Sequence, residues 1–361
     1  MFAHCGPAFP ISRPERKVAA MKQYQLFASG YTASQPGEGA ALLELDGTGL
    51  KKVHSWSGLV NSSYVLPVGD WLYGVEERKG QASVVKIPLE PLGGEIQRFS
   101  VPGSGLCHVC SHKGFLYVAG YAGGTLTGLD KDSGAVCAFY EHQGHSANPV
   151  RQEKAHVHSS LPSPDGRELL VADLGQDRLF RYRIGEKGEL SPNEAQPWVS
   201  VAPGQGPRHF AFHPSGNWLY LVNELEKTLY GFRYRGAEEA IEFFGEYDIS
   251  QPETEGSLAA DIHFTPEGDW LYVSVRGTDR IFCFRWRENG ALEPAGVFSS
   301  GGKEPRSFHI SPDGEFLAAA NQSSGSVVVF PLDKATGALG EKAAELAFPT
   351  VSCVKFRGAE I

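Results

Sequence analysis

Arg208 and Glu224 are two residues whose types and spacing could do chemistry. Each lies eight positions from Gly216, one before it and one after it. The sequence between them is typical of a β-hairpin, because two apolar runs, 210–212 and 218–222, flank the turn-forming residues His-Pro-Ser-Gly. In an antiparallel pair, the two side chains would meet at the open end of the hairpin. Such a pair is either a structural ion pair or part of a site that binds an anion.

The same pattern, a glycine followed by a bulky apolar run, occurs six times along the chain. The glycines are Gly69, Gly114, Gly166, Gly216, Gly268 and Gly314, separated by 45, 52, 50, 52 and 46 residues. Eight positions before them stand Asn61, Leu106, His158, Arg208, Ala260 and Arg306, and eight after them Glu77, Ala122, Leu174, Glu224, Arg276 and Gln322. If equivalent positions share one height in the fold, a cluster of mixed charge forms at one end of it. We expect this cluster to bind a small anionic ligand.

Other polar residues have simpler interpretations. His156 and His158 would place two imidazoles on one strand face, as in some metal sites, but no third ligand with clear spacing accompanies them. Cys107 and Cys110 form a CxxC sequence, yet in a strand they would point to opposite faces, so we expect neither a metal nor a redox site there. Packing, turns or bonds to loop backbone are expected for His209, His213, His263, His309, Asp173, Asn223 and Asn321.

A repeat near fifty residues with four strand candidates per unit predicts an all-β fold, a seven-bladed β-propeller with four-stranded blades. Six glycine-anchored units give six blades. The seventh would combine residues 23–29 and 40–45 with residues 351–356, so that the N- and C-terminal strands close the ring and leave no open sheet edge. The alternative is a pair of β-sandwiches. We expect one domain over residues 22–361, preceded by a disordered extension or misassigned start at residues 1–21.

The composition fits this fold and narrows the function. The 361 residues include 43 Gly and 23 Pro against only 2 Met, which is typical of a turn-rich β protein. The net charge of −9, without a cluster of basic residues, argues against a nucleic-acid partner. No apolar run reaches the length that spans a bilayer, so no membrane partner is expected. Six scattered cysteines indicate reduced thiols in a cytoplasmic protein.

Several short motifs together resemble one known family. They are His156-Val157-His158, Ser163-Pro164-Asp165-Gly166, Asp173-Leu174-Gly175, Gly206-Pro207-Arg208-His209, Asn223-Glu224-Leu225, Arg276-Gly277, Pro305-Arg306 and Asn321-Gln322. With these motifs the chain from Lys22 onward resembles the lactonases with a seven-bladed β-propeller, which include the propeller-type 6-phosphogluconolactonases and the fungal carboxy-muconate cyclases.

The resemblance implies a catalytic site that uses no metal and no cofactor, made of His158, Arg208, Glu224 and Arg276, with His156 as the alternative histidine. One departure is that the family usually has Asn before the last arginine, where this chain has Val275. Since Val275 should point away from the face of Arg276, we expect altered support for this arginine rather than its loss. The candidate substrate-binding residues are His156, Arg306, Asn61 and Glu77.

Hydrolysis of a lactone fits these residue types. A base must activate water, and donors must stabilise the oxyanion that develops on the carbonyl oxygen. His158 or Glu224 could be the base and Arg208 or Arg276 the donor, while the remaining arginine and Arg306 hold the anionic group of the substrate. A Gly-x-Ser-x-Gly motif is missing, which favours direct attack by water.

The leading hypothesis is hydrolysis of 6-phosphogluconolactone in the oxidative pentose phosphate pathway, as the resemblance implies. The first alternative is a lactonase or lactone-forming cyclase for another carboxylated substrate, and the second is a non-catalytic interaction scaffold. The expected partner is a small anionic lactone, and the expected assembly a monomer or weak homo-oligomer.

Overall fold

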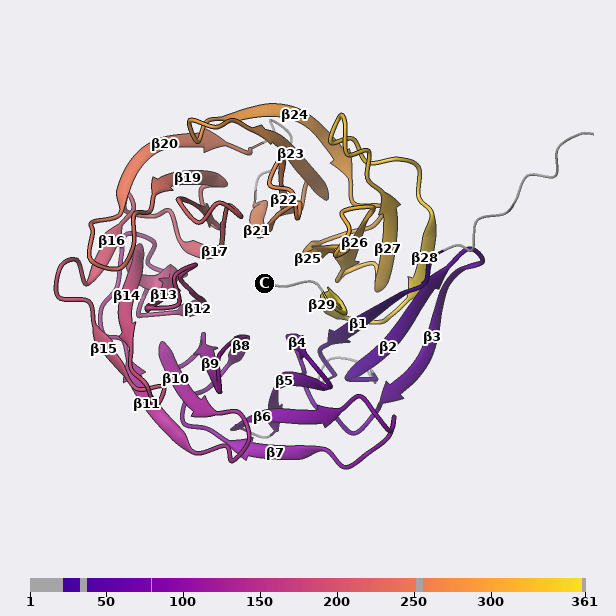
Figure 1. The fold of residues 1–361 in the computed structure, drawn as a ribbon, viewed down its shortest axis with the longest axis horizontal. Helices are drawn as coiled ribbons and strands as arrows, with labels where there is room; N and C mark the ends of the chain where they lie inside the picture. Colours follow the sequence, from indigo (N-terminus) through magenta and orange to yellow (C-terminus); the bar gives the residue numbers. More distant parts are fainter. Residues whose placement is uncertain (1–21, 33–37, 79, 251–255, 359–361) are drawn as a thin grey trace, which may run out of the picture.

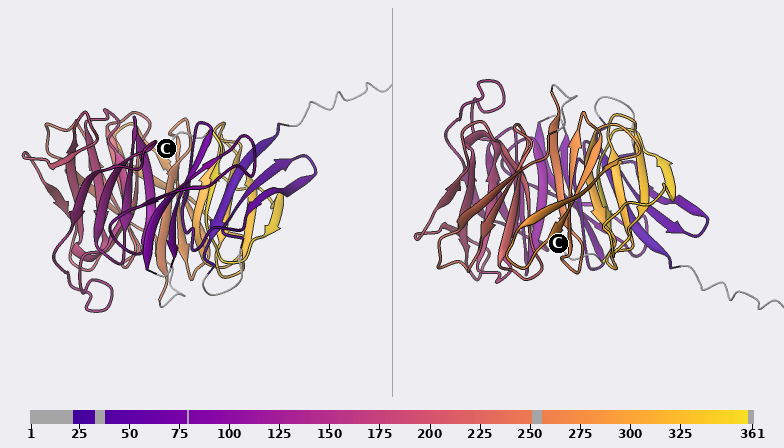
Figure 2. Two further views of the ribbon diagram at one scale, coloured as in Figure 1. Left: turned by 90° about the horizontal axis from the view of Figure 1, so that it is seen from below. Right: turned by 90° about the horizontal axis from the view of Figure 1, so that it is seen from above.

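The computed structural model describes residues 22–32, 38–78, 80–250 and 256–358. Seven antiparallel sheets form a ring around a central axis, so the predicted seven-bladed β-propeller is confirmed (Figure 1). Cavities lined by residues of the innermost strands form a central channel. Seen from the side, the ring is a disc in which the strands run between the two faces (Figure 2). The predicted extension at residues 1–21 lies outside the described residues. No helix in the described part of the chain has the length and apolar character that crossing a membrane requires.

Six blades have four strands and one has five. From the innermost strand outward, the first three blades are β29 (Val351–Phe356), β1 (Tyr24–Gly30), β2 (Ala40–Asp46), β3 (Gly49–Trp56); β4 (Val65–Val68), β5 (Trp71–Arg78), β6 (Gln81–Pro88), β7 (Gln97–Ser100); and β8 (Leu106–His112), β9 (Phe115–Gly120), β10 (Thr125–Asp130), β11 (Val136–Glu141). The fourth is β12 (Val157–Pro162), β13 (Glu168–Asp173), β14 (Arg178–Ile184), β15 (Leu190–Pro192), where β16 (Trp198–Ser200) also pairs with β14 and the 3₁₀ turn η1 (Leu174–Gln176) follows β13. The last three are β17 (Pro207–Phe212), β18 (Trp218–Asn223), β19 (Thr228–Arg233), β20 (Glu242–Asp248); β21 (Leu258–Phe264), β22 (Trp270–Arg276), β23 (Arg280–Trp286), β24 (Leu292–Ser299); and β25 (Pro305–Ile310), β26 (Phe316–Asn321), β27 (Ser326–Pro331), β28 (Ala344–Ala347).

The two ends of the chain share one blade, as predicted. Strand β29 is the innermost strand of that blade and pairs antiparallel with β1, with Ala28 opposite Val354. This pairing joins the last blade to the first one and covers the edge that either strand would otherwise expose.

The core lies between neighbouring blades, and β18 illustrates why the second strand of a blade is an unbroken apolar run. All of its residues are buried. Trp218, Tyr220 and Val222 pack against the following blade, whereas Leu219 and Leu221 pack against the preceding one. Both faces of the strand are therefore apolar, whereas the outermost strand β20 is mostly exposed.

Six of the seven innermost strands, all but β4, contain a β-bulge near their first residues. The register shifts in β8, β12, β17, β21, β25 and β29, at or beside Cys107, His158, Arg208, Ala260, Arg306 and Ser352. A bulge leaves one residue unpaired and turns its side chain away from the regular alternation of the strand. This repeated irregularity places side chains from consecutive blades around the channel.

The length of the hairpin turns explains why the position eight residues before Gly114 is not equivalent to Arg208. Gly216 has a φ of 78°, as a turn of this type requires, but in the shorter hairpin at Gly114 the positive φ falls on Lys113, at 52°. The counterpart of Arg208 in that blade is therefore Cys107 and not Leu106, which pairs regularly with Gly120.

Candidate functional site

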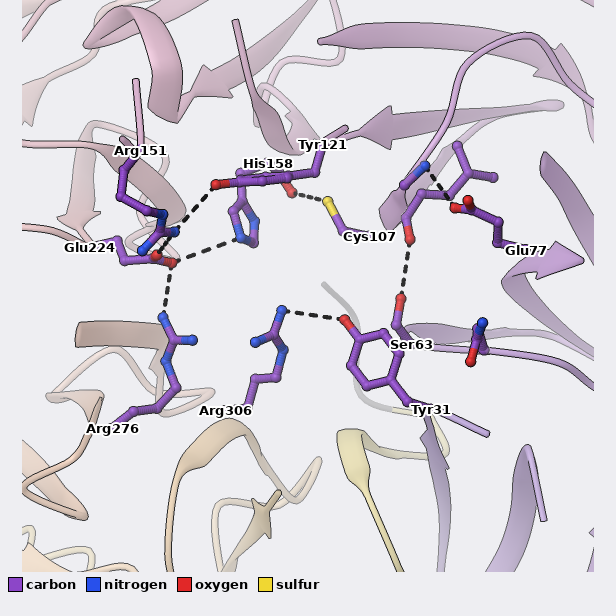
Figure 3. A pocket seen from close by; sticks show the side chains of 13 residues that line it. Tyr31, Ser63, Glu77, Cys107, Tyr121, Arg151, His158, Glu224, Arg276 and Arg306 are labelled. Atoms are coloured by element: carbon purple, nitrogen blue, oxygen red, sulfur yellow. Dashed lines mark hydrogen bonds and ion pairs between the residues drawn. The ribbon is translucent and has the colours of Figure 1, made fainter. Parts of the chain in front are cut away.

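One end of the channel opens into a cavity of about 500 Å³ (Figure 3). It lies where the innermost strands begin and the second strands end. Its lining residues are Tyr31, Asn61, Ser63, Glu77, Gly105, Leu106, Cys107, Tyr121, Arg151, His158, Glu224, Arg276 and Arg306.

Glu224 directly follows β18 and holds three guanidinium groups. Its Oε2 atom accepts a hydrogen bond from Arg208 Nε at 2.9 Å and lies 2.9 Å from Arg276 Nη2, while its Oε1 atom accepts one from Arg151 Nη2. The predicted contact between Arg208 and Glu224 is present, although the bulge at Arg208 makes the pair diagonal rather than directly opposite. The Glu224 side chain is only 2% exposed, so water screens this network weakly.

These arginines determine the charge state of Glu224. Burial raises the pKa of its carboxyl, but Arg276, Arg208 and Arg151 together lower it to about 2. Glu224 is therefore ionised at every physiological pH. A carboxylate that is held so firmly in its charged form accepts a proton poorly.

His158 is the bulged residue of β12. Burial and the neighbouring Arg208, His209 and Arg306 lower the pKa of its imidazole well below the ordinary value, so the ring is neutral at pH 7. Its Nε2 atom lies 4.0 Å from Glu224 Oε2, a separation too long for a hydrogen bond. The ring is thus uncharged and forms no hydrogen bond to Glu224.

Arg306 lines the cavity from β25. Its Nη2 atom donates to the hydroxyl of Tyr31 at 3.4 Å, and the guanidinium lies 5.8 Å from the centre of the Tyr31 ring. Within the described residues, no carboxylate lies within ion-pair distance of Arg306. Its charge is therefore available to a ligand.

The cavity carries an excess of positive charge. Arg151, Arg276 and Arg306 line it against two carboxylates, Glu224 and Glu77, and Arg208 lies just beyond it in the channel. Glu77 is itself engaged, since its Oε2 atom accepts a hydrogen bond from the backbone nitrogen of Gly105 at 2.7 Å. An anionic ligand would reduce the mutual repulsion of the guanidinium groups.

The predicted site residues divide into three groups. His158, Glu224, Arg276, Arg306, Asn61 and Glu77 line the cavity. Arg208 lies in the narrower channel beyond it and bonds the carbonyl oxygen of Ala260 through Nη1 at 2.6 Å. His156 precedes β12 and does not line the cavity.

The contacts of His156 show what it does instead. Its ring stacks on Tyr121 at 4.4 Å between centroids, its Nδ1 atom lies 2.9 Å from the Tyr121 carbonyl oxygen, and its Nε2 atom contacts Glu153. His156 therefore supports Tyr121, and the expectation that both imidazoles lie on one regular strand face is wrong. Across the described ranges, no group of three or more His, Cys, Asp or Glu side chains could hold a metal ion.

The valine before Arg276 points away from it, as expected. Val275 is fully buried among apolar residues between two blades. Arg276 keeps its place through Nη2, which also donates to the carbonyl oxygen of Ala259 at 3.1 Å, whereas its buried Nε atom has no hydrogen-bond partner in the described part of the protein. Burial lowers the pKa of this guanidinium to about 10, in spite of the opposing effect of Glu224.

The sequence pattern missed several lining residues. Tyr31 and Tyr121 occupy the position of Glu224 in their own blades, directly after β1 and β9, and would have been found by counting from the strand end. Cys107 was missed because of the shorter hairpin. Arg151 lies in the long connection between β11 and β12, outside the repeat, so no periodic signal could reveal it.

Known proteins share this fold over nearly the whole ring. The family model "Lactonase, 7-bladed beta-propeller" matches residues 25–356. The 6-phosphogluconolactonase of Formosa agariphila is 29% identical over 344 residues, covering 89% of this chain and 96% of the relative. The 6-phosphogluconolactonase of Bacillus subtilis is 31% identical over 295 residues, which cover 79% of this chain and 83% of the relative. The solved periplasmic gluconolactonase of Pseudomonas aeruginosa is similar with a TM-score of 0.82 and 26% identity, covering 94% of this chain and all of that one.

Proposed function

The chain belongs to the family of lactonases with a seven-bladed β-propeller, and on that basis we propose that it hydrolyses 6-phosphogluconolactone to 6-phosphogluconate. The relatives from F. agariphila and B. subtilis support this substrate, since both are 6-phosphogluconolactonases. The observation that carries the proposal is the cavity, in which a neutral His158 lies beside a cluster of arginines whose charge exceeds that of the nearby carboxylates.

His158 is the general base of this proposal. Its neutral ring can take a proton from the water that attacks the lactone carbonyl, whereas Glu224, with a pKa of about 2, cannot do so effectively. The low pKa of free His158 makes it a weak base. A bound phosphate dianion raises that pKa, because it offsets the field of the arginines.

Glu224 has a different role, which is to position guanidinium groups. It holds Arg151 and Arg276 at the cavity wall and Arg208 in the channel beyond. Arg276 is the donor for the developing oxyanion, since it lines the cavity and its contacts with Ala259 and Glu224 use Nη2, which leaves Nη1 without a bond to any described residue.

The reaction conserves atoms and forms no covalent bond between substrate and protein. The water oxygen bonds to the lactone carbonyl carbon, and its proton passes to His158 Nε2. The oxyanion collapses, the bond from the carbonyl carbon to the ring oxygen breaks, and the imidazolium returns its proton to that oxygen.

Arg306 anchors the phosphate of the substrate. It has no carboxylate partner in the described residues, and the planar guanidinium suits bidentate binding of a phosphate. The guanidinium of Arg306 can bind a carboxylate in the same bidentate way. A lactonase or lactone-forming cyclase for another carboxylated substrate is therefore the second candidate function. A scaffold without catalysis has no need of this convergent charge.

The cellular setting of this proposal is the cytoplasm. The cysteines Cys107, Cys110, Cys137, Cys283 and Cys353 are all free, and free thiols fit a reducing compartment. The proposed assembly is a monomer or weak homo-oligomer, which sedimentation at several protein concentrations tests.

The experiment compares two lactones that differ only in the phosphate. Freshly generated 6-phosphogluconolactone and glucono-δ-lactone are each added to the purified protein, and hydrolysis is followed against the spontaneous rate. We expect kcat/KM to be roughly 10- to 100-fold higher for the phosphorylated lactone, because charged hydrogen bonds contribute about 1.5–3 kcal/mol. Arg306→Ala should remove most of this preference. Equal rates for the two lactones would favour the second candidate.

A further inference from the structure

Beyond the cavity, the channel narrows between His158 on β12 and His209 on β17. The constriction has a volume of about 10 Å³ and is lined by both histidines together with polar residues such as Ser307 and Ser352. A polar space of this size is close to what one water molecule needs, roughly 10–15 Å³.

Two buried ring nitrogens at this constriction have no hydrogen-bond partner among the described protein atoms. They are His158 Nδ1 and His209 Nε2. The ring centroids are 5.2 Å apart and the planes are inclined by 73°. An unsatisfied buried polar atom costs free energy, and both rings line the constriction, together with a third residue whose buried polar atom has no partner, Ser307 with its Oγ.

The other nitrogen of His209 is firmly held. Its Nδ1 atom lies 2.8 Å from Oδ1 of Asp261 on β21. Asp261 is itself fixed, since its carboxylate accepts hydrogen bonds from the backbone nitrogens of Ile262 at 3.0 Å and Phe308 at 3.2 Å. The carboxylate can only accept, so the proton of the neutral His209 ring is on Nδ1 and its Nε2 atom is an acceptor.

We propose that Asp261 and His209 are positioning residues that fix the tautomer of His158 through one water molecule bound in the constriction. This proposal rests on the proposed function, in which His158 Nε2 is the general base. The water donates to His209 Nε2 and accepts from His158 Nδ1. The neutral His158 ring then carries its proton on Nδ1, and its Nε2 lone pair faces the cavity.

This arrangement gives the base two properties that the reaction requires. The ring cannot adopt the opposite tautomer, in which Nε2 would carry a proton and be unable to accept one. When Nε2 takes the proton of the attacking water, the chain of hydrogen bonds to Asp261 partly offsets the positive charge of the imidazolium.

Charged and titratable groups from the neighbouring blades surround His158 and His209. They are Tyr64, Cys107, His108, Tyr121, Arg208, Glu224, Asp261, His263, Arg276, Arg306, His309 and Lys355. Burial and Arg208 lower the pKa of His209 to about 4 although Asp261 opposes them, so His209 is neutral at pH 7 as the arrangement requires.

The first experiment reads the tautomer of His158 directly. Protein labelled with ¹⁵N in its histidines is studied by two-bond ¹H–¹⁵N correlation at pH 7.5, and His158→Gln identifies the signal. We expect the Nδ1–H tautomer in the wild type. In Asp261→Asn the neutral amide holds the proton of His209 on Nδ1 less firmly than the carboxylate does, so the Nε2–H tautomer of His158 should become populated.

Kinetics provide the second experiment. Asp261→Asn and His209→Gln should each lower kcat by about 10- to 100-fold, the usual effect of residues that orient a ligand or base, with KM nearly unchanged. The matched control is His309→Gln, since His309 lies in the same channel but its Nδ1 atom accepts a hydrogen bond from the backbone nitrogen of Phe356 at 3.0 Å and, among the described residues, from no other group. This control should keep the wild-type kcat.

The outcomes separate this inference from the proposed function. An Nε2–H tautomer in the wild type, or wild-type kcat in a folded His209→Gln protein, would overturn the inference while lactone hydrolysis stands. The expected tautomers in a protein that hydrolyses no lactone would support the hydrogen-bonded pair and refute the proposed function. If Asp261→Asn does not fold, His209→Gln decides the kinetic question alone.

Discussion

Replacing Glu224 with glutamine is expected to destabilise the protein by about 3 kcal/mol at pH 7. The magnitude follows from the charge network around this residue. The pKa of Glu224 is about 2, against an ordinary value of 4.5, and each pH unit of difference corresponds to about 1.4 kcal/mol. Glutamine has nearly the shape of the protonated acid, so the substitution removes this stabilisation and leaves Arg151, Arg208 and Arg276 without their shared counter-charge.

The destabilisation caused by Glu224→Gln should become smaller as the pH falls. A carboxyl with a depressed folded-state pKa contributes its full stabilisation above its unfolded pKa of about 4.5 and loses it as the pH falls toward about 2. Between pH 7 and pH 4 the wild type therefore loses about 1 kcal/mol of the stabilisation from Glu224. The variant lacks this contribution, so the difference between the two proteins should be smaller by that amount at pH 4.

Urea unfolding at pH 7, 5 and 4 measures both quantities. The matched control is Glu77→Gln, because Glu77 lines the same cavity but, among the described residues, its carboxylate accepts a hydrogen bond only from the backbone nitrogen of Gly105, which an amide oxygen can also accept. This control substitution should lower the free energy of unfolding by less than about 1 kcal/mol. Inorganic phosphate should restore more stability to Glu224→Gln than it adds to the wild type. A Glu224→Gln protein as stable as the wild type at pH 7, or a difference independent of pH, would refute the reasoning.

Three further predictions concern the arginines, metals and ring closure. Arg306→Ala should raise KM for the phosphorylated lactone by roughly 10- to 100-fold with little change in kcat, whereas Arg276→Ala should mainly lower kcat, and steady-state kinetics of both variants test this. Exhaustive chelation with EDTA should leave activity unchanged, and a loss that zinc or calcium restores would contradict the proposed mechanism. Removing the chain from Val351 onward deletes β29 and exposes the edge of β1, so light scattering should detect aggregation, and a soluble monomer with wild-type unfolding would contradict the role of ring closure.

The sequence was sufficient to predict the propeller and its closure because each blade repeats one physical pattern. The turn before β18 needs a glycine with positive φ, and the strand itself must be apolar on both faces, so the two features recur together. Strand β29 was predicted at its observed residues because an isolated strand at the C-terminus matched the strand missing from the first blade.

The site was only partly predictable from this repeat. Counting from glycines located His158, Arg208, Glu224, Arg276 and Arg306, whose hairpins have similar lengths. The same count gave the wrong residue where the hairpin is shorter, as at Cys107. It could not locate Arg151, because this residue lies in a connection between two blades and not in the repeat.

The histidines show a second limit, which is that sequence patterns do not encode irregular backbone. Regular strand alternation would place His156 and His158 on one face, but the bulge at His158 turns that ring into the channel while His156 stacks on Tyr121. His209, expected to serve packing or a turn, instead bonds Asp261 inside the channel. These contacts depend on three neighbouring blades meeting at one axis, a relation that only the folded ring creates.

The central claim, that this cavity hydrolyses a phosphorylated sugar lactone, is tested most directly by the rate of 6-phosphogluconate formation. Freshly generated 6-phosphogluconolactone is mixed with wild-type protein or with His158→Gln, and the product is followed through a coupled dehydrogenase against the spontaneous reaction. The mechanism predicts fast, saturable hydrolysis by the wild type and a kcat lower by about 10²- to 10⁴-fold in His158→Gln, the usual contribution of a general base. Hydrolysis no faster than the spontaneous rate, or equal rates for the two proteins, would contradict it.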